Sequence, residues 1–147
     1  MARFRYRMQN ILNVKEKLES QARNEFAMAA ARLNEEEEKL SALNDRKSGY
    51  EQHLKELFST ILDLGEVKET ENSIEIIKYH IEEQKLKVAA CAQELEVARQ
   101  KLTVAIQERK THEKLKENQF EEFKAEEAAK ESKEIDELVS FRYGDEG

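Results

Sequence analysis

Residues 67–112 read VKETENSIEIIKYHIEEQKLKVAACAQELEVARQKLTVAIQERKTH, and this stretch decides the fold. Steps of three and four residues alternate strictly from Val67 to His112 and meet 14 positions, of which ten are apolar. This spacing places apolar side chains on one face of an α-helix and is typical of a coiled-coil stripe. The stripe consists of Val67, Thr70, Ile74, Ile77, Ile81, Gln84, Val88, Cys91, Leu95, Ala98, Leu102, Ala105, Arg109 and His112.

A second stripe of this kind precedes it and contains one irregularity. Of its 18 positions, 15 are apolar, and two successive steps of four meet at Ala22. Such an insertion is a stutter, which locally unwinds a supercoil. This stripe consists of Phe4, Met8, Ile11, Lys15, Leu18, Ala22, Phe26, Ala29, Leu33, Glu36, Leu40, Leu43, Lys47, Tyr50, Leu54, Leu57, Ile61 and Leu64.

The chain has no proline, a residue that breaks helix interiors, so neither stripe is interrupted by one. Gly65 lies between the stripes, where a left-handed glycine ends many helices, and Asn72 with Glu75 resembles a capping box. We therefore predict an all-α fold, a long antiparallel two-helix coiled-coil hairpin that occupies residues 1–147 as a single unit. The expected parts are a helix at about 4–64, a turn at about 64–67, a helix at about 68–140 and an acidic tail at 141–147.

A hairpin that turns there has a definite register. It would place Glu36 near Arg99 and Glu25 near Arg109, pairs that fix register more than they add stability. A helix of about 60 residues is roughly 90 Å long, which predicts a rod.

The composition excludes several classes of protein. Charged residues make up 39 % of the chain and aromatic residues 7 %, too polar a mixture for a compact enzyme core. The longest apolar run, 26–31, is far shorter than the about 20 residues of a membrane span, so we expect a cytoplasmic protein. The lone Cys91 is read as an apolar filler.

Catalytic and metal-binding patterns are also missing. His53, His80 and His112 have no histidine or cysteine at helical spacing, so no metal or other cofactor is expected. The glutamates at 35–38 point to different sides of a helix and are read as a solvated acidic face. There is no phosphate loop or nucleophile motif, and we expect no enzymatic activity.

The alternating arginines at 3, 5 and 7 make an RNA-binding helical arm an alternative function. Residues 1–116 nevertheless carry 21 basic and 21 acidic residues, so they offer no basic stripe to a nucleic acid, and none is expected as a partner. The last 31 residues carry 11 acidic and four basic residues, which suits either a solvated end or contact with a basic partner.

Four segments in order resemble the FliJ family of flagellar export proteins. They are FRYRMQNILNVKE at 4–16, ERKTHEKLKE at 108–117, FEEF at 120–123 and KEIDEL at 133–138. The resemblance implies a cytoplasmic coiled coil of the flagellar type III export apparatus, peripherally attached at the membrane. Its implied partners are the hexameric export ATPase FliI, the export gate protein FlhA and export chaperones.

The resemblance also implies contact residues. For the ATPase they are Arg3, Phe4, Arg5, Tyr6, Asp136, Glu137 and Leu138, and for the gate they are Ile77, His80 and Gln84. Ile77 and Gln84 belong to the α-helical stripe and are better read as core positions, whereas His80 lies beside the stripe and is the better exposed candidate. A stalk of a virulence-type secretion system, or a generic coiled-coil tether, remains an alternative function.

Overall fold

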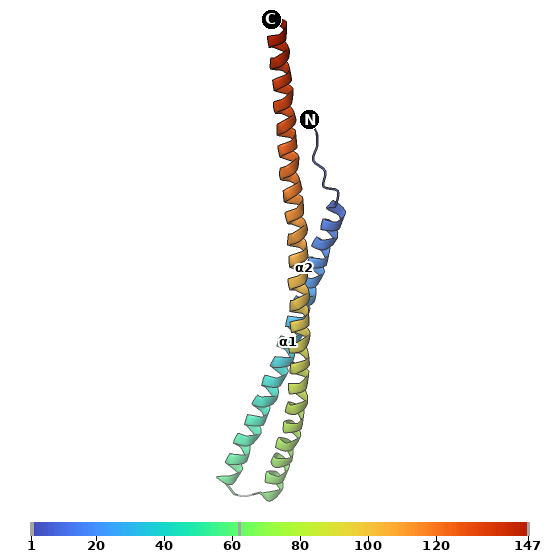
Figure 1. The fold of residues 1–147 in the computed structure, drawn as a ribbon. Coiled ribbons are helices and arrows are strands. Elements are labelled where there is room, and N and C mark those ends of the chain that lie inside the picture. Colours follow the sequence, from blue (N-terminus) through green and yellow to red (C-terminus); the bar gives the residue numbers. More distant parts are fainter. Residues whose placement is uncertain (1, 62, 147) are drawn as a thin grey trace. The chain divides into compact units, whose positions relative to one another are not determined.

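The computed structural model contains two long helices, α1 at Gln9–Phe58 and α2 at Leu64–Glu146 (Figure 1). It describes residues 2–61 and 63–146, without the side chains of 145 and 146. Position 62 of the expected first helix and Gly147 of the expected tail lie outside the described residues. Within the described ranges there is no strand, and the predicted all-α, two-helix fold is confirmed.

The contacts divide the chain into two compact units. The first unit combines the residues up to Gln21 with those from Thr103 onward, and the second spans Ala22–Leu102. In the second unit α1 and α2 are joined by residues 59–63 and run antiparallel (Figure 1). In the first unit they also run antiparallel, because Lys15 contacts Glu108 whereas the earlier Tyr6 contacts the later His112.

The predicted stripe of α2 forms the inner side of both units. All 14 of its positions are buried or half-buried, and the most buried aliphatic side chain among them is Ile77, at 3 % exposure. The seven buried positions are Val67, Thr70, Ile74, Ile77, Ile81, Gln84 and Ala98. Apolar residues repeated every three or four positions pack along one face of the helix, as the spacing predicts.

The stripe of α1 differs from the prediction near its start. Leu12 and Glu19 are buried, whereas the predicted Ile11 and Leu18 are more than 40 % exposed. With these two substitutions the steps of four and three alternate regularly from Met8 through Ala22 to Leu57, so the sequence contains no stutter. The prediction was wrong because it favoured apolar residues, and Glu19 is a charged stripe residue with a charged partner on α2.

The turn also lies earlier than expected. Ser59 N–H and its hydroxyl both donate to the carbonyl of Glu56, which closes the last turn of α1. The carboxylate of Asp63 accepts hydrogen bonds from Gly65 N at 3.0 Å and Glu66 N at 3.3 Å, so Asp63 is the N-cap of α2. Gly65 therefore begins a helix instead of ending one, and no described glycine has a positive φ. The supposed capping box at Asn72 lies inside α2.

This displacement changes the helix bounds and the register. Because the chain reverses at 59–63, each residue of α1 faces a residue of α2 earlier than expected. Glu36 contacts Gln84 instead of Arg99, and Arg109 pairs with Glu19 instead of Glu25. α1 starts at residue 9 instead of about 4, and α2 continues through the expected tail to residue 146.

Candidate functional site

The non-helical segment before α1 lies against α2 within the first unit. The ring of Phe4 contacts Phe120 edge-on at 5.0 Å and Phe123 at 5.5 Å between centroids. Tyr6 is buried at 7 % exposure, and its hydroxyl donates a long 3.4 Å hydrogen bond to the carbonyl of His112. Aromatic side chains with these contacts replace the helical stripe and cover α2 where α1 has not yet begun.

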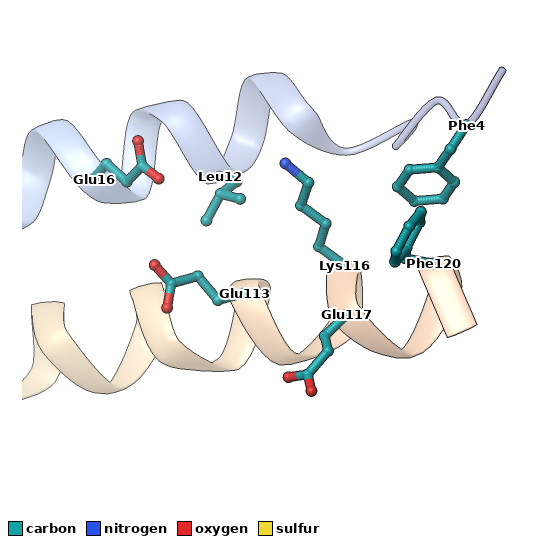
Figure 2. A pocket seen from close by; sticks show the side chains of 7 residues that line it. All are labelled: Phe4, Leu12, Glu16, Glu113, Lys116, Glu117 and Phe120. Carbon is teal, nitrogen blue, oxygen red and sulfur yellow. The ribbon is translucent and has the colours of Figure 1, made fainter. Parts of the chain in front are cut away.

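A groove of about 460 Å³ opens beside Phe4. Its apolar wall comes from Phe4, Leu12 and Phe120, and its rim carries charged side chains of both helices. Figure 2 shows the Phe4 and Phe120 rings against each other and Leu12 directed into the space between the helices. The seven lining residues are Phe4, Leu12, Glu16, Glu113, Lys116, Glu117 and Phe120.

Next to this groove, the inner stripe of the first unit consists of charged side chains. Lys15 Nζ lies 3.0 Å from Glu108 Oε2, and Arg109 bonds Glu19 through Nε and Nη2. Arg109 Nη1 also donates to Glu113 at 2.8 Å. The hydrogen bond to Glu19 raises the pKa of the Arg109 guanidinium, desolvation opposes this, and Glu113 adds to the increase. Arg109 thus remains charged in the stripe and links both helices.

The C-terminal part of α2 has no covering element in the described first unit. Every residue from 128 to 144 is exposed, including the candidate residues Asp136, Glu137 and Leu138. Five large apolar side chains are exposed within nine residues of this stretch. They are Ile135, Leu138, Val139, Phe141 and Tyr143.

The two candidate sets for the ATPase occupy different places. Phe4 reaches α2 at Phe123, and Asp136 lies 13 residues farther along the same helix. At 1.5 Å per residue this is about 20 Å along the helix axis, too far for side-chain contact. Of the N-terminal candidates, Arg3 and Arg5 are exposed, Phe4 is half-buried and Tyr6 is buried.

The three gate candidates do not share one surface. Ile77 and Gln84 are buried in the stripe of the second unit, and His80 is exposed. Gln84 Nε2 donates to the Glu36 carbonyl at 3.0 Å and to its carboxylate. The hydrogen bond from Gln84 lowers the pKa of the Glu36 carboxyl, against the opposing effect of desolvation, and Lys39 assists. Gln84 therefore has a structural partner inside the hairpin.

Other exposed residues accompany His80 and were missed by the sequence reasoning. Tyr79, at 64 % exposure, lies with its ring 5.9 Å from that of His80, and His80 Nδ1 is 3.6 Å from Glu83. Hydrogen bonding to Glu83 raises the pKa of the Tyr79 hydroxyl. Ile76 and Leu86 are also exposed and lie at helical spacing from these residues. Apolar residues off the stripe were the signal that could have identified this face.

The described residues contain no group of three histidine, cysteine or acidic side chains that could hold a metal ion. No helix in the described part of the chain is both long and apolar enough to cross a bilayer. The candidate residues are characterised by their exposure and their contacts, and they lie on α2 and on the segment before α1.

Comparisons with known proteins agree with this architecture. The structure is similar to that of CT670 from Chlamydia trachomatis, described as a candidate YscO homolog, with a TM-score of 0.64 and 22 % identity over 96 % of each chain. At this identity the similarity concerns the fold. Comparison with curated protein sequences gives no match. The family model described as flagellar FliJ protein matches residues 4–147. Since that match spans nearly every residue, the chain belongs to the FliJ family.

Proposed function

We propose that this FliJ-family chain is a non-enzymatic stalk and adaptor of the flagellar type III export apparatus. It would bind the export ATPase FliI, promote assembly of its hexamer, and connect the ATPase with the export gate protein FlhA and export chaperones. The family match over residues 4–147 carries the proposal. Its place of action would be the cytoplasmic face of the membrane apparatus.

The exposed C-terminal part of α2 supports a contact with the ATPase. Ile135, Leu138 and Val139 leave apolar surface in water, and covering that surface on a partner would stabilise the complex. A chain that binds the assembled ring more tightly than its free subunits shifts the equilibrium toward the ring by that difference in affinity. No chemical step by the chain is needed.

Binding and hydrolysis measured with purified ATPase test this proposal. The wild-type chain should co-migrate with the ATPase and raise hydrolysis per subunit, most clearly at low enzyme concentration where rings dissociate. Leu138→Glu should weaken both effects because it places a charge in the apolar patch. Leu86→Glu is the matched control, since Leu86 is equally apolar and exposed but lies in the other unit. Absence of co-migration and stimulation by the wild-type chain would refute the proposal.

The exposed face around His80 is our proposed contact for FlhA. His80, Tyr79 and Ile76 project from α2 of the second unit, and none of them is needed for the inner stripe. Tyr79→Ala and His80→Ala should reduce capture of purified FlhA and leave ATPase stimulation unchanged. Leu138→Glu should behave in the opposite way. Equal loss of both activities in every variant would contradict two separate contact surfaces.

The same binding assay separates the flagellar function from the virulence-type alternative. A flagellar stalk should prefer the flagellar export ATPase to the homologous ATPase of a virulence secretion system from the same cell. Preference for the virulence enzyme would favour the alternative.

A further inference from the structure

The outward side of α2 in the second unit carries a second regular stripe. It starts at Ile76, alternates steps of three and four residues, and lies two positions beyond each residue of the inner stripe. Two positions correspond to about 200° around an α-helix, so this stripe lies opposite the inner one. We call it the outer stripe, and all of its residues are exposed. They are Ile76, Tyr79, Glu83, Leu86, Ala90, Gln93, Val97 and Gln100.

The outer stripe has few charges for a surface that faces water. Only Glu83 is charged among its eight residues, whereas the 39 % share of charged residues in the chain would give about three. Its four large apolar side chains are between 41 and 73 % exposed. On α1, the residues two positions beyond the inner stripe, from 24 to 56, include four acidic residues among ten and one large apolar residue, Met28. The scarcity of charge is therefore particular to α2.

Two rows of residues flank the outer stripe, and they differ in charge. One row consists of Glu75, Glu82, Ala89 and Glu96, and the other of His80, Lys87, Glu94 and Lys101. In a parallel two-stranded coiled coil, a residue of the first row meets the residue five positions later on the other helix. That rule pairs Glu82 with Lys87 of a second copy, and Glu96 with Lys101 of a second copy. An antiparallel pair would place the glutamate rows against each other.

We infer that two copies of this chain associate in parallel through the outer stripes of their second units. The flanking charges identify the occupant as a second copy, because the two rows of one sequence complement each other when the copies lie in register. Ile76 and Val97 occupy one class of stripe position and Leu86 the other, an arrangement of β-branched residues and leucine that favours two parallel strands.

The glutamates of the first row already have partners within their own helix. Glu82 lies 3.2 Å from Lys85, and Glu96 lies 3.7 Å from Arg99. Both pairs are exposed, and exposed pairs contribute little free energy. Exchanging them for pairs across the dimer therefore costs little, and the new pairs set orientation more than strength.

Glu83 limits the strength of the dimer. In the parallel arrangement it faces Glu83 of the second copy, and one charged stripe residue lowers affinity while it fixes register. The association is therefore weak and reversible. Because it covers Ile76 and Tyr79, it excludes the contact proposed above for FlhA. The inference itself does not depend on that proposal, since self-association is measured on the purified chain alone.

Sedimentation equilibrium of the full chain tests the inference. The wild-type chain should form dimers as its concentration rises. Leu86→Gln should weaken dimerisation by about tenfold or more, and Glu83→Leu should strengthen it by a similar factor, because an apolar layer replaces two facing carboxylates. Met28→Gln is the matched control on α1 of the same unit and should leave the dimer unchanged. Equal weakening by Leu86→Gln and Met28→Gln would overturn the inference.

Charge exchange tests the pairing of the flanking rows. Glu82→Lys/Glu96→Lys and Lys87→Glu/Lys101→Glu each place like charges against each other and should dimerise more weakly than the wild-type chain. The quadruple variant that combines all four changes restores opposite charges across the dimer and should dimerise like the wild-type chain. Circular dichroism of each variant checks that helix content is retained. A quadruple variant as weak as the two double variants would overturn the parallel arrangement.

A disulfide measures the orientation directly. In a Cys91→Ser background, Val97→Cys should crosslink two copies at this one position, because identical residues face each other in a parallel dimer. Met28→Cys should not crosslink. A wild-type chain that remains monomeric at about 1 mM would overturn the inference. If Leu86→Gln then abolished binding of purified FlhA, the outer stripe would belong to that partner.

Discussion

In both units α1 and α2 pack through an inner stripe, but the side chains that form the stripe differ between the units. Near the chain reversal the inner stripe is aliphatic, with Leu57, Val67 and Ile77 buried. Near the termini it is largely charged or aromatic, with Lys15, Glu19 and Arg109 in stripe positions. Aliphatic layers supply stability and tolerate shifts in register, whereas ionic layers supply register and little net stability. The unit with the ionic layers is also the one in which α2 is exposed throughout residues 128–144.

The aliphatic layer should show the largest effect on stability. Ile77→Ala removes a side chain that is 3 % exposed, and such truncations lower the free energy of unfolding by about 2–5 kcal/mol. Ile76→Ala is the matched control, because Ile76 is the sequence neighbour of Ile77 but is 59 % exposed. This substitution should lower the free energy of unfolding by less than about 0.5 kcal/mol. Urea denaturation followed by helical circular dichroism measures both. Similar losses for the two variants would contradict the assigned face of α2.

The N-cap at the chain reversal should have the next largest effect. Asp63→Ala removes the acceptor for two backbone N–H groups of α2 and should lower the free energy of unfolding by about 1 kcal/mol. Asp63→Asn should retain most of the stability, since asparagine caps helices equally well. A loss in Asp63→Asn as large as in Asp63→Ala would show that charge, and not capping, matters there.

The first prediction depends on the stripe of α2, which the sequence predicts correctly, and the second depends on the chain reversal, which it misplaces. The stripe of α2 was predictable because its apolar spacing is regular over 14 positions. The chain reversal was misplaced because Gly65 was read as a helix end, whereas the local hydrogen bonds of Asp63 decide it. Glu19 was missed because a charged stripe residue is recognisable only with its partner Arg109, which lies far away in sequence. The candidate surface around Tyr79 was missed for a related reason, since spacing reveals buried faces better than exposed ones.

The ionic layer should respond differently from the aliphatic layer. Arg109→Leu removes the guanidinium that bonds the buried Glu19 carboxylate and should lower Tm by a few degrees. Adding Glu19→Leu should restore Tm, because two apolar side chains replace the pair. Thermal melts of the three proteins check this. A double variant that is less stable than the wild-type chain would mean that the ionic layer contributes net stability.

The polar layer of the second unit should give the smallest effect, visible only in acid. Because the Glu36 pKa is lowered below its ordinary value of 4.5 in the folded chain, its contribution to stability is present above that value. The contribution is lost as the pH falls from about 4.5 through the folded pKa. Gln84→Leu removes the main cause of the shift, so its Tm should fall less between pH 6 and pH 3 than that of the wild-type chain. Parallel Tm profiles of the two proteins would argue against the Gln84–Glu36 contact.

The antiparallel register within one chain is the claim on which both units and all contact surfaces depend. Crosslinking of cysteine pairs in a Cys91→Ser background measures it most directly. Glu36→Cys with Gln84→Cys, and Lys15→Cys with Glu108→Cys, should each form rapid crosslinks within a single chain. Glu36→Cys with Arg99→Cys should not. Rapid crosslinking of that last pair, or crosslinks formed only between two chains, would contradict the account.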